Sequence, residues 1–236
     1  MTADAASRTV PGHPIDHDID DFADIDGRLI QDRTYRVRVY AEDDDTMRAR
    51  GMVRDIKPPG VYVRDDPDPL TVHHMVVDLV VAFPSLEILD ADVVIEIHPN
   101  LACPRIEDHY KNLIGLPIGR GFTHRIRELF GGPRGCTHTT ALLQAMAPAV
   151  VQATWSMRST RGAEVTDPEE REAAIRQRQE ARVRHNVDSC HVWAADGELT
   201  AIAASGQPTP VLLPVAKRAR ALGLDPETEW RKWVQR

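Results

Sequence analysis

A long alternation of apolar and mixed positions over residues 72–83 is the feature that most restricts the fold. Successive side chains of a strand point to opposite faces of a sheet. One face of this strand is wholly apolar and must pack in a core: Met75, Val77, Leu79, Val81 and Phe83. The opposite face carries His74 and Asp78 between valines, which suits either a covering helix or the wall of a pocket.

Three further segments, residues 34–39, 47–57 and 86–97, also have the patterning of strands. The segments between them contain turn residues, which predicts an antiparallel meander. Beyond Pro99 the pattern becomes helical, and we expect the strongest helix over 137–157, where apolar residues recur at three- and four-residue spacing. The other predicted elements are helices over 105–114, 123–130 with Thr123 as N-cap, 167–184 and 225–236, and a strand over 190–194.

The length of the chain, 236 residues of which 42% are hydrophobic, suffices for one large domain with a buried core. We therefore predict a single α+β domain over residues 26–236, in which a mostly antiparallel sheet is covered by helices. Residues 1–25 mix Pro, Gly, His and Asp without apolar periodicity. This composition predicts a flexible N-terminal arm.

The composition disfavours two classes of partner. Acidic residues outnumber basic ones by 36 to 29 and there is no long basic run, whereas binding of nucleic acid needs a positive patch. No stretch approaches the roughly 20 consecutive apolar residues of a membrane helix, and the N-terminus lacks the apolar core of a signal peptide. We expect a cytoplasmic protein that binds a small molecule and neither nucleic acid nor membrane, with homo-oligomer formation left open.

The string Gly135-Cys136-Thr137-His138 is the strongest candidate for chemistry. It follows a glycine-rich loop and enters the predicted central helix, whose positive dipole end stabilises a thiolate at Cys136. His138 lies on the apolar stripe of that helix, so we expect its side chain to point inward. Cys136 and His138 can then act as catalytic nucleophile and base, or as metal ligands. A buried cysteine beside a capping histidine is the alternative without function.

All three cysteines lie at boundaries of predicted elements, each with a histidine nearby in the sequence. One hypothesis is a zinc or iron ion held by thiolates and imidazoles. Its predicted ligands are Cys103, Cys136, His138, Cys190 and His191. The alternative is three isolated cysteines, because the long separations lack the compact spacing of a zinc finger.

Three residues are candidates for binding a substrate. Arg120 and Arg125 flank the start of a predicted helix and can bind a carboxylate or phosphate. His74 projects from the mixed face of the best strand. Its neighbour His73 must point to the opposite face, so the two cannot serve the same centre. Surface charges and a hydrogen-bonded histidine are the plainer alternatives.

A series of short motifs is spread along residues 26–197. They are Asp26-Gly27-Arg28, Val72-His73-His74-Met75, Cys103-Pro104, the segment 113–119, Gly135-Cys136-Thr137-His138, Val151-Gln152-Ala153 and Ser189-Cys190-His191. In these motifs, above all in Gly-Cys-Thr-His, the sequence resembles the bacterial family known as domain of unknown function 2889. The resemblance implies a bacterial, cytoplasmic, single-domain protein and brings no activity with it. The histidine pair departs from the family pattern.

The order of strands, Gly135-Cys136 helix start and Cys190-His191 is also similar to that of the iron–sulfur scaffold and sulfur-acceptor fold. Cys103 departs from that fold because it follows the strands instead of preceding them. The sequence therefore predicts an enzyme that acts on a small organic molecule through Cys136 and His138, with or without a metal ion. The competing class is a non-catalytic metal-binding or iron–sulfur protein of scaffold or sulfur-carrier type.

Overall fold

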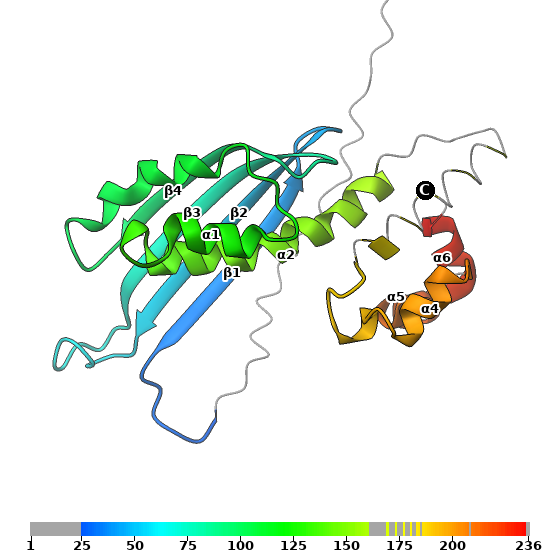
Figure 1. Ribbon diagram of the computed structural model, residues 1–236. Coiled ribbons are helices and arrows are strands. Elements are labelled where there is room, and N and C mark those ends of the chain that lie inside the picture. Colours follow the sequence, from blue (N-terminus) through cyan, green and yellow to red (C-terminus); the bar gives the residue numbers. More distant parts are fainter. Residues whose placement is uncertain are drawn as a thin grey trace, which may run out of the picture.

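The computed structural model describes residues 25–160, 186–207 and 209–234, with single positions between 169 and 184 (Figure 1). The predicted N-terminal arm lies outside the described residues except for Ile25. The helix predicted over 167–184 is described only at scattered positions, which are helical. The arm therefore stays a prediction.

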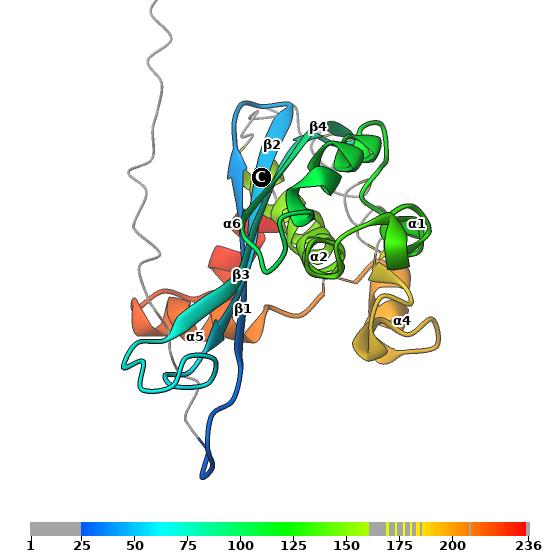
Figure 2. The same ribbon diagram turned by 90° about the vertical axis from the view of Figure 1, so that its left-hand side faces the viewer.

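Four strands form one antiparallel sheet in the order β1-β2-β3-β4. They are β1 (Asp32–Ala41), β2 (Thr46–Lys57), β3 (Leu70–Ala82) and β4 (Ile88–Ile97). Each strand pairs with the next along the chain, which confirms the predicted meander. The α+β class is also confirmed, because helices follow the sheet in the chain and cover one of its faces (Figure 2).

The helical elements all follow β4. They are the 3-10 helices η1 (Cys103–Leu113), η2 (Gly132–Arg134) and η3 (His191–Trp193), and the α-helices α1 (Phe122–Phe130), α2 (Thr137–Thr160), α4 (Glu198–Ala204), α5 (Leu213–Ala221) and α6 (Pro226–Val234). The long helix predicted at residue 137 begins there. None of the described helices combines the length and apolarity needed to cross a membrane.

Two local predictions from the sequence were wrong. The segment predicted as a strand over 190–194 instead contains η3, in which Trp193 is buried. An apolar run this short does not distinguish a strand from a helical turn. Thr123 is not an N-cap, because α1 already begins at Phe122, whose side chain is buried in the core.

The apolar row of β3 is the centre of the core. Met75, Val77, Leu79 and Val81 are each at most 1% exposed. Helix α2 packs on this face against β1, β2 and β3, while η1 packs against β4. In the edge-on view of the sheet, α1 and α2 lie on the same side of it (Figure 2). The helices and the sheet thus share one hydrophobic core.

On the other face of β3, polar side chains pair with residues of the neighbouring strands. His74 Nδ1 lies 2.7 Å from a carboxylate oxygen of Glu96 on β4. Arg50 of β2 donates two hydrogen bonds, of 2.7 and 2.8 Å, to the carboxylate of Asp78. The two polar positions that the sequence placed on this face are therefore paired across the strands.

Gly51 in the middle of β2 allows α2 to approach the sheet closely. A Cβ atom at this position would lie 2.5 Å from Met146 Sδ and 3.2 Å from Leu142 Cδ1. Met146 is itself 1% exposed, so its side chain has no free space to enter. The spacing between sheet and helix therefore depends on the absence of a side chain at Gly51.

We predict that Gly51→Ala lowers the free energy of unfolding by roughly 1–3 kcal/mol, the usual cost of overpacking a core. Met146→Ala alone should cost roughly 2–5 kcal/mol because it leaves a cavity. In the double variant the new methyl group has room. The loss of unfolding free energy in the double variant should therefore be smaller than the sum of the losses in the two single variants. Urea unfolding of the four proteins measures this. Strictly additive costs would contradict the proposed contact.

Candidate metal centre

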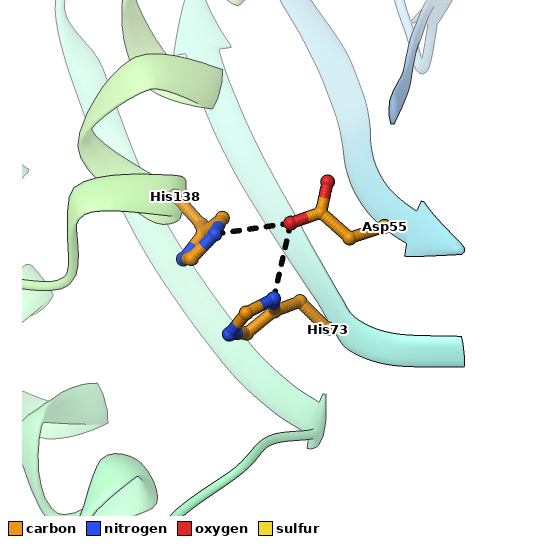
Figure 3. Close-up of side chains that lie close together, drawn as sticks. All are labelled: Asp55, His73 and His138. Carbon is orange, nitrogen blue, oxygen red and sulfur yellow. Dashed lines mark hydrogen bonds and ion pairs between the residues drawn. The ribbon is translucent and has the colours of Figure 1, made fainter. Parts of the chain in front are cut away.

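Three side chains that are far apart in the sequence meet at one end of the sheet: Asp55, His73 and His138 (Figure 3). Their possible ligand atoms all lie within 4.8 Å of one another. Asp55 Oδ2 is 3.0 Å from His73 Nδ1 and 3.1 Å from His138 Nε2. The two imidazole rings stack on each other, with centroids 3.9 Å apart. Among the described residues, this is the one group of three or more such side chains within that distance.

The sheet and α2 position these side chains in a simple way. Asp55 on β2 and His73 on β3 are direct cross-strand partners and point to the helix-covered face. Just beyond this pair the register shifts, so that Ile56 pairs with Thr71. Irregularities of this kind locally re-aim side chains and are common beside functional sites. His138 comes from the first turn of α2, which lies over the same end of the sheet.

Gly135 fixes the entry of the chain into α2. A Cβ atom there would lie 2.5 Å from the backbone oxygen of Phe130 and 3.0 Å from the hydroxyl of Tyr110. The Tyr110 hydroxyl also accepts a 2.8 Å hydrogen bond from the backbone N–H of Cys136. The glycine of the Gly-Cys-Thr-His motif is therefore required by packing, and it places His138 at the cluster.

Asp55 is 2% exposed and is held by Arg33, its direct partner on β1. Arg33 Nε donates a 2.6 Å hydrogen bond to Oδ1, and Nη2 donates one of 2.7 Å to Oδ2. These bonds lower the pKa of Asp55 below its ordinary value, although burial opposes the shift. Asp55 is thus a carboxylate at neutral pH despite being buried.

The charge on Asp55 fixes the protons on both histidines. A carboxylate only accepts hydrogen bonds, so His73 Nδ1 and His138 Nε2 each carry the hydrogen that points toward it. Burial lowers the pKa of His138, and the electrostatic influence of His73 and Arg33 adds to this shift. His138 is therefore neutral at pH 7, with its Nδ1 lone pair directed away from Asp55.

Cys136 lies on that second side of His138. Its Sγ atom is 3.9 Å from His138 Nδ1, within the range of a hydrogen bond to sulfur. The thiol is half-buried and packs against the core. The imidazole of His138 thus contacts two groups, the thiol of Cys136 through Nδ1 and the carboxylate of Asp55 through Nε2.

A pocket of about 770 Å³ opens over the cluster. Asp55, His73 and His138 line part of it, and Cys136 does not. The other lining residues are Gln31, Arg33, Lys57, Tyr62, Leu70, Val72 and Pro99. A molecule in this pocket would therefore meet the two imidazoles directly, with the buried carboxylate of Asp55 beside them.

The structure brings only one of the five predicted metal ligands, His138, into this cluster. Cys103 begins η1 and packs half-buried against the core. Cys190 is exposed, and His191 follows it at the start of η3. No group of three possible ligands among the described residues contains a cysteine. The joint metal site of the three cysteines stays a prediction without support from this geometry.

The predicted substrate residues lie away from the pocket lining. His74 pairs with Glu96 on the opposite face of the sheet from His73. Arg120 donates a 2.6 Å hydrogen bond to the backbone oxygen of Val187. Arg125 pairs with Glu128 one turn later on α1, at 3.1 Å. Each has a structural partner, and their role toward a substrate stays a prediction.

Asp55 and His73 were missed by the reasoning from sequence, although a signal for each was present. His73 shares the two-residue period of Met75 and Val77, which are buried, so its imidazole had to face the core. Asp55 likewise continues the period of Ala49 and Val53 on β2. A charged or titratable residue in an otherwise apolar row must find a partner when it is buried.

Comparison with known proteins identifies a family for this chain. The model of the family described as "Protein of unknown function (DUF2889)" matches residues 31–152, slightly more than half of the chain. The matched segment contains Asp55, His73, Cys136 and His138 and ends before Cys190. No curated protein and no solved structure matches the chain.

The lowered pKa of His138 predicts a dependence of stability on pH. The unfolded histidine has a pKa of about 6.5, and the folded value lies below it. As the pH falls below the unfolded value, the unfolded state binds a proton before the folded state does, so the free energy of unfolding falls. In His138→Gln this contribution should vanish, and the stability should change less between pH 7.5 and pH 5.5. Urea unfolding at each pH measures the slope.

His124→Gln is the matched control for this measurement, because His124 is exposed on α1 and its only described ion pair is with Glu128. Its pH slope should stay close to that of the unmodified protein. If the unmodified protein and His138→Gln have the same slope, the lowered pKa of His138 is contradicted.

Proposed function

The chain belongs to the DUF2889 family, whose description assigns no activity, and we propose that it is a metal-dependent enzyme acting on a small organic molecule. The observation that carries the proposal is the convergence of Asp55, His73 and His138 on the wall of an open pocket. The predicted cytoplasmic location and the oligomeric state stay predictions.

The donor set suits a transition metal. Two imidazoles and one carboxylate are a common ligand set of zinc and of non-haem iron(II). Catalytic zinc sites typically use three protein ligands and leave a position open to water or substrate. Asp55, His73 and His138 supply three ligands, and the pocket supplies access to an open position.

The spacing of the donor atoms supports the same conclusion. Bonds of about 2.0–2.1 Å from zinc to nitrogen or oxygen place neighbouring ligand atoms of a tetrahedral site roughly 3.3 Å apart. Asp55 Oδ2 lies 3.0 Å from His73 Nδ1 and 3.1 Å from His138 Nε2. A shift of a few tenths of an ångström, with the proton of each ligating ring nitrogen lost or moved to the other nitrogen, would convert these hydrogen bonds into a set of ligands.

The surrounding side chains provide the support that such ligands need. Arg33 holds both oxygens of Asp55 and so fixes the orientation of the carboxylate. When His138 Nε2 binds a metal, its Nδ1 carries the hydrogen and faces Cys136 Sγ. Metal-binding histidines usually donate their second N–H to a hydrogen-bond acceptor, which fixes the ring, and here the sulfur of Cys136 takes that position. A bound ion would polarise a substrate or lower the pKa of a water molecule.

The iron–sulfur alternative receives less support. Iron–sulfur clusters are held mainly by cysteine thiolates, whereas the described ligand group contains none. The geometry therefore favours a single ion with nitrogen and oxygen ligands. Elemental analysis and an absorption spectrum of the untagged protein distinguish the two, because a cluster would bring iron, inorganic sulfide and colour.

A second candidate function rests on the contact between Cys136 and His138. The order thiol, imidazole, carboxylate in Cys136, His138 and Asp55 is that of a nucleophile, its base and the group that orients the base. In this mechanism His138 Nδ1 accepts the proton of the thiol. Cys136 does not line the pocket, so we place this candidate after the metal site.

For the metal site, we predict that isothermal titration detects one high-affinity Zn²⁺ site per chain. Asp55→Asn and His73→Gln should each weaken the affinity by more than the roughly 10–100-fold that loss of a supporting residue costs. His74→Gln is the matched control, because it changes the adjacent histidine on the opposite face of β3. Circular dichroism would check that each variant is folded. Equal affinities of His73→Gln and His74→Gln would exclude the proposed site.

For the thiol candidate, the prediction concerns the rate at which iodoacetamide alkylates each cysteine at pH 7. If His138 acts as base, His138→Gln should slow alkylation of Cys136 by roughly a hundredfold, the low end of the range for loss of general-base assistance. Mass spectrometry of the peptides reports each cysteine separately, so Cys103 and Cys190 serve as internal controls. An unchanged rate at Cys136 would argue against the thiol mechanism.

A further inference from the structure

Lys57 is a positive charge on the wall of the pocket and has no anionic partner among the described residues. It is the last residue of β2, two positions after Asp55, and is half-buried. Its Nζ atom lies 5.7 Å from the centre of the Tyr62 ring, in a cation–π contact. Lys57 forms no ion pair with any residue that the structure describes. Anions are therefore attracted to this part of the pocket.

The other charges of the pocket do not neutralise Lys57. Of the described residues that line the pocket, Asp55 is the only acidic one, and Arg33 already occupies both of its oxygens. The pocket thus keeps a net positive charge, which is located on the amine of Lys57.

Apart from Gln31, the remaining side chains that line the pocket are apolar or aromatic. Tyr62, Leu70, Val72 and Pro99 line it. Tyr62 is 65% exposed and Leu70 39% exposed, which leaves apolar surface available to a ligand. Small-molecule sites commonly combine such apolar walls with a few polar groups that fix the orientation of the ligand.

We propose that the pocket binds a small organic acid, with its carboxylate at Lys57 and its apolar body against Tyr62, Leu70 and Val72. The proposal names the substrate class of the metal site and rests on the proposed function for its catalytic meaning. Lys57 and the metal ligands line the same pocket, so a small acid bound at Lys57 lies in the space that adjoins Asp55, His73 and His138.

Binding of benzoate, compared with benzamide, tests the proposal. The two probes have nearly the same shape, and only benzoate carries a charge. We expect the unmodified full-length protein to bind benzoate at least about tenfold more tightly, as one charge-assisted hydrogen bond implies. Lys57→Gln should remove this preference, whereas Lys57→Arg, which keeps the charge, should retain most of it. Isothermal titration or ligand-observed NMR measures the affinities.

Two further variants separate this proposal from the metal site. Lys111→Gln is the control for loss of a lysine, because Lys111 lies near Asp90 and Asp92 and does not line the pocket. It should bind benzoate like the unmodified protein. His73→Gln removes a metal ligand and leaves Lys57 in place, so it should keep the preference for benzoate while its affinity for Zn²⁺ falls.

Three outcomes would each overturn the carboxylate site. They are a failure to bind benzoate, equal binding of benzoate and benzamide, and a preference for benzoate that remains in Lys57→Gln. Normal binding of Zn²⁺ in the same samples would show that the metal site stands without it. In the opposite case, the protein prefers benzoate through Lys57 but binds neither Zn²⁺ nor Fe²⁺. This result supports the acid site and refutes the metal-dependent function.

Discussion

The candidate site depends on the pairing of one buried carboxylate with one guanidinium. Asp55 lies in a row of buried residues on β2, beneath α2, where an unpaired charge would cost several kcal/mol. Arg33 compensates this cost with two hydrogen bonds from the adjacent strand. Because the carboxylate stays charged, both histidines turn their N–H groups toward it. The orientation of both imidazoles toward Asp55 follows from this one ion pair.

Close packing determines where the third member of the cluster lies. Gly51 brings α2 near the sheet, and Gly135 brings the start of α2 near Phe130 and Tyr110. With both constraints in place, the first turn of the helix comes over the ends of β2 and β3, and His138 reaches Asp55. A rigid sheet and a buried helix hold functional groups more precisely than loops do.

His138 links the two chemical functions considered for this site. Through Nε2 it belongs to the group of possible metal ligands, and through Nδ1 it contacts the thiol of Cys136. The lining of the pocket favours the metal, since Asp55, His73 and His138 line it and Cys136 does not. The thiol is then best understood as a hydrogen-bond partner that orients the imidazole.

The sequence by itself determined the meander, its buried face and the long helix at residue 137, because two- and 3.6-residue periods are local properties of the chain. It also indicated His138, since a histidine on an apolar stripe must point inward. It did not identify Asp55 and His73 as partners of His138. That grouping depends on the register between β2 and β3 and on the position of α2 over them. Only the tertiary structure decided it, because contacts between distant residues arise from packing and leave no periodic trace in the sequence.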